Sequence, residues 1–347
     1  MKIVKGFLKG LSFIGVFLVF AVITIYVSGL IICYGPSKAA RDLFVTTFLE
    51  TGQMKFVVSM LVSDEKVQEI VASNSMETFD EDIDDNLIKI DTKDEDKKDI
   101  ELVKVSGSTF AGKMIMVKDP SRVKVSTIYD GSWKEYGVTL DQLVKKEDAF
   151  AGINGGLYVS TLNKGGRPMG VVVKDHKIQF NSPAGLAGLY LIGFNDDNLL
   201  RIIDIEGKSA DAVKKLIEEE KIRDAVAFQE ESSDANNHFV KLIINGKTRD
   251  IKGKGSGANP RTVIGQKADG TVLLLVTDGR GKNGHLGATA QDLIDVMEEY
   301  GAVNAANIDG GSSSAMYYDG HYEMTSVTFY YDNSSWKLPT GFIVEKR

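Results

Sequence analysis

The sequence predicts an α+β fold, with a single domain of mixed strands and helices behind an N-terminal transmembrane helix. Three observations carry this prediction. Near the N-terminus, an uncharged apolar run is long enough to cross a membrane. From about residue 100, short β-rich runs alternate with turns that contain Gly and Asn. Three helical segments interrupt these runs, and about 250 residues of this mixture suit one domain.

The elements expected in this domain, residues 100–347, follow from composition and from turn and cap signals. Strands are expected at 123–128, 149–153, 170–173, 189–193, 242–244, 271–276, 303–308 and 341–344. Helices are expected at 139–146, 209–220 and 289–300. The last helix has Thr289 as its cap, Asp292 at the third helical position and Gly301 just past its end.

Residues 11–34 are the apolar run, and they predict a transmembrane helix. At 1.5 Å per residue the run covers a hydrocarbon core of about 30 Å. It is too long for a signal peptide and no small-x-small cleavage site follows, so a retained anchor is favoured over a cleaved signal. Lys2, Lys5 and Lys9 precede the run without an acidic residue, which predicts a cytoplasmic N-terminus, residues 1–10. We therefore expect a single-pass protein of the cell membrane with the domain at residues 100–347 outside the cell.

Two segments connect the anchor to the domain. Residues 35–76 predict short juxtamembrane helices at 39–49, at 54–62 and after Ser63, whose apolar faces pack on each other or on the bilayer. Residues 77–99 hold eleven Asp and Glu against four Lys, few aromatic residues and no periodicity. This composition predicts a solvated acidic linker.

Charge and cysteine content exclude several classes of function. The net charge is −7, and the linker accounts for all of it, which leaves 37 acidic and 37 basic residues elsewhere. Such a balance argues against nucleic acid as a partner, because a phosphate backbone needs a surplus of Lys and Arg. A single Cys excludes an intramolecular disulfide and a Cys-built zinc site, and four scattered His make a metal cluster improbable. No cofactor or metal is expected.

Four polar motifs stand at the ends of apolar strands, where active sites are usually assembled. They are AFAGINGGLY at 149–158, NPRTVIG at 259–265, LLLVTDGR at 273–280 and AANIDGGSSSAM at 305–316. Each has a simpler explanation when taken alone, because Asn-Gly and Asp-Gly pairs are common turn formers and an Arg can be a surface cation or pair with an Asp. Residues 253–258 also match the dinucleotide-binding pattern G-x-G-x-x-A. However, Asn259-Pro260 follows where the helix of that motif would begin, so dinucleotide binding is not expected.

Together and in this order, the four motifs resemble the phosphodiester glycosidase family. This group includes the vertebrate enzyme that removes N-acetylglucosamine from phosphomannose, and bacterial members labelled as exopolysaccharide biosynthesis proteins. The resemblance runs from about Ala149 to the C-terminus and includes GATAQDL at 287–293. The anchor and juxtamembrane helices are similar to the membrane-bound bacterial subgroup. One departure is His238-Phe239-Val240, where Phe-Gly-Pro is expected in relatives.

The resemblance implies a hydrolase for a sugar 1-phosphodiester, which is cleaved between the anomeric carbon and oxygen to give a free sugar and a phosphomonoester. Arg261 and Arg280 are the candidates for binding the phosphodiester, because planar guanidinium forks suit its oxygens. The backbone N–H groups of Gly310, Gly311 and Ser312 are a second source of donors.

Asp309 is the expected catalytic carboxylate. A phosphate monoester is already a good leaving group, so a carboxylate facing the oxocarbenium-like carbon is needed more than a general acid. Asp278 is expected to act as a second carboxylate, or to hold an Arg or a water. Further substrate contacts are expected from Asn154, Ser312 and Ser313, with His285 at the rim.

Other classes of function stay open. A non-catalytic glycan-binding or assembly protein would keep the fold without the chemistry. A serine hydrolase would use Ser313, because Gly311-x-Ser313-x-Ala315 approximates a nucleophile elbow, although strand-like residues follow it. A metal-dependent phosphodiesterase would need clustered His and Asp ligands, which the sequence does not show.

Overall fold

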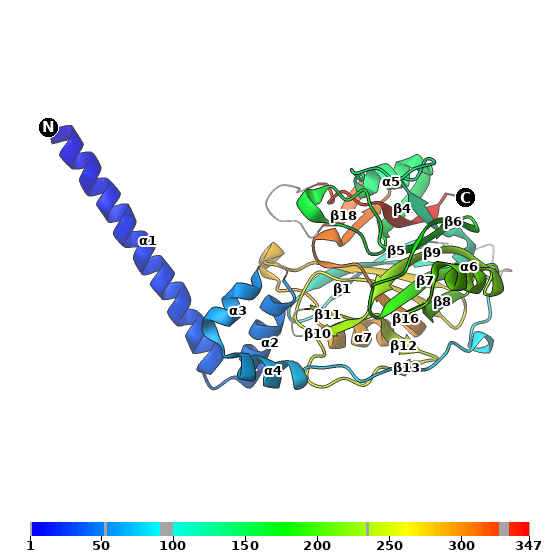
Figure 1. The fold of residues 1–347 in the computed structure, drawn as a ribbon, viewed down its shortest axis with the longest axis horizontal. Helices are drawn as coiled ribbons and strands as arrows, with labels where there is room; N and C mark the ends of the chain where they lie inside the picture. Colours follow the sequence, from blue (N-terminus) through cyan, green and yellow to red (C-terminus); the bar gives the residue numbers. More distant parts are fainter. Residues whose placement is uncertain (1, 52–53, 91–99, 234–235, 326–332, 347) are drawn as a thin grey trace.

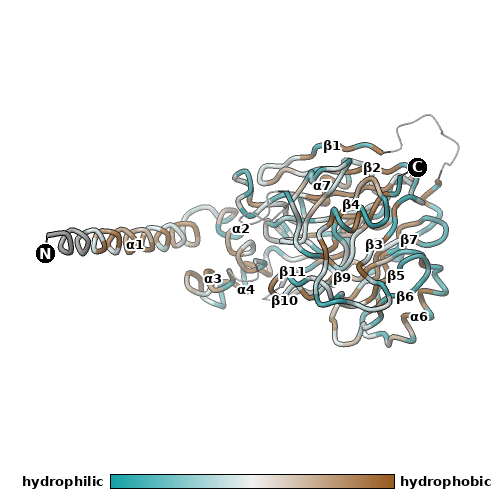
Figure 2. The backbone as a smooth tube through the Cα atoms, turned by 90° about the horizontal axis from the view of Figure 1, so that it is seen from above, coloured by the Kyte–Doolittle hydropathy of each residue, from teal (hydrophilic) through white to brown (hydrophobic). Residues whose placement is uncertain are grey.

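The computed structural model describes residues 2–51, 54–90, 100–233, 236–325 and 333–346. The chain begins in one long helix, α1 (Lys2–Tyr34), whose N-terminal part projects away from the other elements while its C-terminal end lies against the helices that follow (Figure 1). Within it, Gly10–Tyr34 is a stretch of 25 residues that is long and apolar enough to cross a membrane. Figure 2 shows this apolar character along the projecting helix. A membrane anchor and a signal sequence both have this property.

Three short helices follow where the sequence predicts them. They are α2 (Lys38–Leu49), α3 (Lys55–Leu61) and α4 (Asp64–Ala72). Ser63 caps α4, because its hydroxyl accepts a hydrogen bond from the Lys66 amide. The three helices and the end of α1 enclose a small core of their own, which contains Val45, Val58 and Ile70. Their apolar faces therefore pack on each other, and the bundle lies against one side of the main body (Figure 1).

The acidic segment differs from the solvated linker that its composition predicts. Over the part that the structure describes, residues 77–90, it lies on the domain, and its apolar residues Phe79, Ile83 and Ile88 are partly or fully covered. Lys241 Nζ donates to the carbonyl oxygens of Phe79 and Glu81, at 3.0 Å each. A composition average hides these apolar residues, which are spaced among the acidic ones. Residues 91–99 lie outside the described residues.

A seven-stranded antiparallel sheet forms the centre of the domain. Its order is β1 (Ile100–Ser106), β2 (Ala111–Val117), β15 (Val272–Thr277), β14 (Thr262–Lys267), β16 (Ala302–Ile308), β12 (Lys241–Ile244) and β13 (Lys247–Thr248). Every residue of β15 is buried, because both faces of the sheet are covered. Leu274 faces the central core, while Leu273 and Leu275 pack with helix α7 (Ala290–Glu299).

Two five-stranded sheets share the central core with the first. One has the order β18 (His321–Thr325), β17 (Ala315–Tyr318), β4 (Ala149–Asn154), β19 (Thr340–Glu345) and β3 (Val123–Thr127). The other has the order β6 (Lys177–Ser182), β5 (Gly170–Lys174), β9 (Ile222–Gln229), β7 (Leu189–Asn195) and β8 (Leu200–Asp204). Helix α5 (Leu140–Lys146) packs on the first of these sheets, and α6 (Ala210–Glu219) on the second. The predicted α+β class is confirmed, as are the positions of the predicted strands and helices.

The strand directions bring the polar motifs to one edge. Strand β14 runs antiparallel to both of its neighbours, with Thr262 opposite Val276 of β15 and Ile308 of β16. The start of β14 therefore lies beside the ends of β15 and β16. Strand β17 pairs with β4 through Met316 and Ile153, so the end of β4 reaches the same region. All four motifs meet where the seven-stranded sheet adjoins the β4–β17 sheet.

Candidate active site

Asn154 connects the two sheets at this edge. It is 0% exposed, and its Nδ2 donates to the backbone oxygen of Asp309 at 2.6 Å. Its Oδ1 accepts from the Thr262 hydroxyl at 2.8 Å and from the Ala315 amide at 3.2 Å. The expected contact of Asn154 with substrate is thus replaced here by contacts that hold the DGG turn in place.

Asp309 follows β16 directly and begins that turn. Burial raises the pKa of Asp309 to about 7, against the opposing effects of hydrogen bonds from Ser313 and the Gly310 amide and of the charge on Arg280. At neutral pH the carboxyl group is therefore divided between its protonated and ionised forms. A carboxyl with a pKa near the working pH is suited to acid, base or charge-stabilising chemistry.

Gly311 allows the turn to approach Arg280 closely. It has a φ of 61°, and a Cβ at this position would lie 2.7 Å from Arg280 Nη2. Its amide donates to the Pro260 carbonyl at 2.8 Å, and the Gly310 amide bonds to the Asp309 carboxylate. Two of the three amides expected to bind phosphate are therefore used within the protein.

Arg280 lies across the turn with its side chain open to solvent. Its backbone is left-handed, with a φ of 56°, and it follows the end of β15 by three residues. Nη1 donates to the Ser312 hydroxyl at 2.7 Å, and Nε donates to Asn259 Oδ1 at a longer 3.4 Å. The surrounding protein and the nearby Arg261 lower the pKa of Arg280 to about 10, while Asp309 acts in the opposite direction. Arg280 remains a cation that an anionic ligand can reach.

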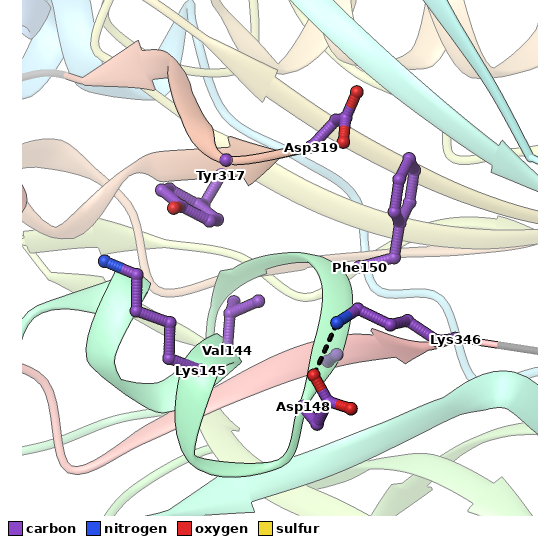
Figure 3. Close-up of a pocket in the computed structure, with 9 residues that line it drawn as sticks. Val144, Lys145, Asp148, Phe150, Tyr317, Asp319 and Lys346 are labelled. Carbon is purple, nitrogen blue, oxygen red and sulfur yellow. Dashed lines mark hydrogen bonds and ion pairs between the residues drawn. The ribbon is translucent and has the colours of Figure 1, made fainter.

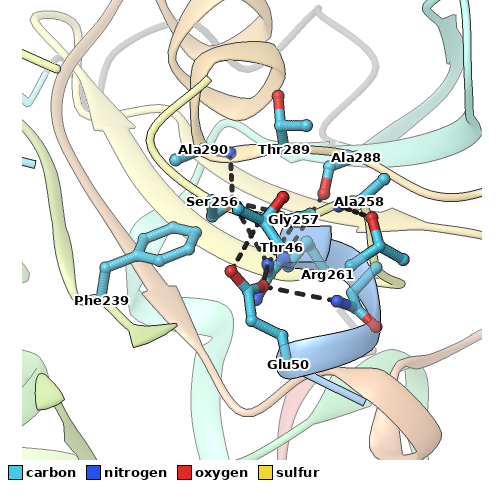
Figure 4. A network of polar contacts seen from close by, with 12 residues as sticks. Thr46, Glu50, Phe239, Ser256, Gly257, Ala258, Arg261, Ala288, Thr289 and Ala290 are labelled. Atoms are coloured by element: carbon cyan, nitrogen blue, oxygen red, sulfur yellow. Dashed lines mark hydrogen bonds and ion pairs between the residues drawn. The ribbon is translucent and has the colours of Figure 1, made fainter. Parts of the chain in front are cut away.

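Arg261 is placed differently, since only 7% of it is exposed. Its Nη2 donates to Glu50 Oε2 at 2.6 Å and to the Gly257 carbonyl at 3.0 Å (Figure 4). Nε donates to the Ala288 carbonyl at 3.4 Å, and the guanidinium lies 4.9 Å from the centre of the Phe239 ring. Sequence reasoning missed Glu50, which lies 211 residues away in the juxtamembrane segment and carries no motif.

Asp278 and His285 form a pair at the end of β15. Asp278 is 2% exposed; its Oδ1 accepts from the Ala111 amide at 2.8 Å, and its Oδ2 lies 2.6 Å from His285 Nδ1. Both carboxylate oxygens are therefore engaged, and Asp278 holds a His rather than the Arg or water that the sequence suggests. His285 is half-buried on the loop after Arg280, and its contact with substrate at the rim stays a prediction.

Ser313 is buried beside Asp309. Its Oγ lies 2.9 Å from the Tyr158 hydroxyl, and burial raises the pKa of that Tyr. Among the described residues, no His contacts Ser313, and the next regular element is strand β17. A nucleophile elbow needs a base beside the Ser and a helix after it, so this geometry does not favour a serine hydrolase.

A separate cavity of about 280 Å³ opens at the other end of β4 and β17 (Figure 3). Phe150, Tyr317 and Asp319 line it, together with the ion pair of Lys346 and Asp148. It lies at the opposite end of β4 from Asn154, and of the four motifs only Ala149 and Phe150, the first two residues of the first motif, line it. In the described part of the chain, no cluster of three or more His, Cys, Asp or Glu side chains has the arrangement of a metal site.

The chain is similar to several known proteins. It is 26% identical over 234 residues to the SPβ prophage-derived uncharacterized protein YomE of Bacillus subtilis, which covers 64% of this chain and 33% of that protein. The chain thus spans about a third of the length of this relative. Among solved structures, it is similar to the catalytic domain of zebrafish N-acetylglucosamine-1-phosphodiester α-N-acetylglucosaminidase, auto-inhibited by its pro-peptide, with a TM-score of 0.52 and 18% identity. That match covers 75% of this chain and 87% of the zebrafish chain.

A putative exported protein of Burkholderia pseudomallei is similar with a TM-score of 0.44 and 13% identity, over 68% of this chain and 74% of the other. The family described as phosphodiester glycosidase matches residues 147–345, which is more than half of the chain and includes all four motifs. The chain therefore belongs to the phosphodiester glycosidase family.

Proposed function

We propose that the protein is a membrane-anchored extracellular hydrolase that cleaves the glycosidic bond of a sugar 1-phosphodiester in a cell-surface or exopolysaccharide-type glycan. One observation carries the proposal. Asp309, with its pKa raised to about 7, and the accessible cation Arg280 stand on either side of the same glycine turn. A carboxyl group poised near neutrality beside an anion-binding Arg is the combination that this reaction needs.

In this mechanism Arg280 binds the phosphodiester, with the Ser312 hydroxyl beside it. The bond between the anomeric carbon and the phosphate oxygen breaks, and the electron pair leaves with the phosphate monoester. Ionised Asp309 stabilises the positive charge that develops at the anomeric carbon. Water supplies the new oxygen of the sugar, and its proton passes to a carboxylate or to solvent. Asp278 acts indirectly, by holding His285 at the rim.

The membrane part of the proposal rests on α1 and on the three Lys residues before its apolar run. A retained anchor predicts that the full-length protein sediments with membranes until detergent is added. An extracellular domain predicts that protease added to intact cells degrades it. Release without detergent would favour a cleaved signal, and protection until lysis would reverse the topology.

Hydrolysis in water enriched in heavy oxygen tests the reaction itself. Wild-type protein is incubated with a sugar 1-phosphodiester, and both products are analysed by mass spectrometry, with Asp309→Asn as the matched control. Label in the free sugar supports glycosidic cleavage. Label in the phosphate would make the protein a phosphodiesterase. If no glycosyl phosphodiester gave a product, a non-catalytic glycan-binding protein would be the remaining explanation.

A further inference from the structure

Glu50 brings the juxtamembrane segment into contact with the candidate site. It is the C-cap residue of α2, and its side chain is 7% exposed. Oε1 accepts from the Gly257 amide at 2.6 Å, and Oε2 accepts from Arg261 Nη2 at 2.6 Å (Figure 4). A buried carboxylate that meets both a guanidinium and a backbone amide has its charge well compensated. The contact is therefore a buried structural interaction rather than a surface ion pair.

Helix α2 lies directly on the loop that carries these partners. The Ala258 amide donates to the Thr47 hydroxyl at 3.0 Å. Gly257 leaves no room for a side chain, because a Cβ there would lie 2.5 Å from Thr47 N. This loop contains the G-x-G-x-x-A match of the sequence, and Gly257, which occupies one of its x positions, allows close docking of the helix. Such backbone-to-backbone packing fixes where the Glu50 carboxylate stands.

The contacts of Glu50 extend toward both arginines. Asn259 Nδ2 donates to Glu50 Oε2, and Asn259 Oδ1 accepts from Arg280 Nε, each at 3.4 Å. On Arg261, Nη2 and Nε are engaged by Glu50 and the nearby backbone, whereas no hydrogen bond links Nη1 to any residue that the structure describes. The arginines are also close enough that Arg261 lowers the pKa of Arg280. Hydrogen bonds thus hold Nε and Nη2 of Arg261, while Nη1 stays available to bind an anion.

We propose that Glu50 is a positioning residue of the phosphate pocket, which orients Arg261 so that it binds the substrate phosphate together with Arg280. Helix α2 of the juxtamembrane segment then completes the site. This inference rests on the proposed function, because it assigns the phosphate-binding part of the same site. It also makes the membrane-proximal bundle part of the enzyme rather than a spacer.

Full-length protein in detergent with Glu50→Gln tests this assignment. The amide removes the charge that pairs with Arg261 while nearly preserving the shape of the side chain. We expect the Kd for inorganic phosphate, measured by titration calorimetry, and the KM for a sugar 1-phosphodiester each to rise about tenfold, with kcat within about twofold of wild type. Glu69→Gln, on the exposed part of α4, is the matched control and leaves both constants unchanged.

Glu50→Asp keeps the charge but shortens the side chain, and it decides the question if Glu50→Gln does not fold. We expect it to weaken phosphate binding by a smaller factor. A folded Glu50 variant with unchanged phosphate Kd and KM would overturn the proposal. So would higher activity or tighter phosphate binding, because Glu50 would then block Arg261 rather than orient it.

The phosphate titration separates this inference from the proposed reaction. If wild-type protein binds phosphate but hydrolyses no sugar phosphodiester, the proposed function fails and the effect of Glu50→Gln on the Kd still decides the role of Glu50. If wild-type protein binds no phosphate, the pocket and the role of Glu50 both fail.

Discussion

Two Asp-Gly pairs follow β15 and β16, the two strands that flank β14 in the seven-stranded sheet, and their carboxylates have different environments. Asp278 is buried with both oxygens engaged by the Ala111 amide and His285. Asp309 is only partly exposed. Its hydrogen bonds and the charge on Arg280 do not fully offset the cost of burying its own charge, so its pKa rises to about 7. We therefore expect the same short motif to supply a structural carboxylate in one place and a reactive one in the other. What differs is the protein environment around each carboxylate, which the motif does not encode.

The two arginines repeat this contrast. Arg261 is buried and held by Glu50 and by backbone carbonyls, whereas Arg280 reaches solvent and bonds to the Ser312 hydroxyl. We therefore expect Arg280 to make the more accessible contact with an anion, and Arg261 to combine a structural task with binding. Substitutions at these four positions test whether the two contrasts hold.

The largest effect is expected from Asp309→Asn. The amide is nearly isosteric, but it can neither stabilise positive charge nor accept a proton from water, so kcat should fall by about 10³-fold or more. Phosphate binding and Tm should stay close to wild type. An Asn forms the same turn about as well, so near-normal turnover would reduce Asp309 to a turn residue.

Asp278→Asn should reduce kcat less and stability more. The amide oxygen can still accept from the Ala111 amide, but the hydrogen bond between a carboxylate oxygen and His285 Nδ1 is lost. Losing a buried hydrogen bond to a charged group costs about 2 kcal/mol of the free energy of unfolding, which chemical denaturation measures. If Asp278→Asn instead abolished turnover at unchanged stability, Asp278 would be a second catalytic carboxylate.

Arg280→Lys should raise the KM for a phosphodiester and the inhibition constant of inorganic phosphate by about tenfold, because a point charge cannot replace a planar fork. Its Tm should change little, since the side chain is exposed. Arg261→Lys is the informative partner variant and should lower Tm as well as weaken binding. Unchanged kinetics in both variants would remove the arginines from phosphate binding.

The smallest effect is expected in the pH dependence of stability. The pKa of Asp309 is 3.8 as its ordinary value and about 7 in the folded protein. Between about pH 4 and pH 7 the folded state therefore retains a proton that the unfolded chain has released, and raising the pH across this window lowers the free energy of unfolding. Relative to Asp309→Asn, wild-type Tm should fall by several degrees over that range. A rise, or no change, would contradict the raised pKa.

The strand ends were predictable because apolar runs followed by Asp-Gly or Asn-Gly are local patterns. Strand β9 was not predicted, since Arg223 and Asp224 interrupt its apolar run. In the structure these two side chains are buried and pair with each other at 2.6 Å, which offsets the cost of burying their charges. A residue-by-residue pattern cannot anticipate such a pair.

The candidate site was predictable as a set of residues but not as a set of roles. Asn154, Asp278 and Arg261 each came from a motif, yet their bonds to Asp309, His285 and Glu50 depend on tertiary packing. Glu50 had no sequence signal, because nothing in the juxtamembrane segment indicates that α2 docks on a loop two hundred residues later. The packed part of the acidic segment was missed for the same reason.

The most direct test of the contrast between the two carboxylates is a titration of their side chains by NMR. Protein labelled with carbon-13 at the Asp carboxyl groups would be followed from pH 4 to pH 9, with the Asp309 signal assigned by its absence in Asp309→Asn. We predict a midpoint near pH 7 for Asp309. A midpoint below about pH 5 would contradict the account, because Asp309 would then be an ordinary ionised carboxylate rather than one poised for the reaction.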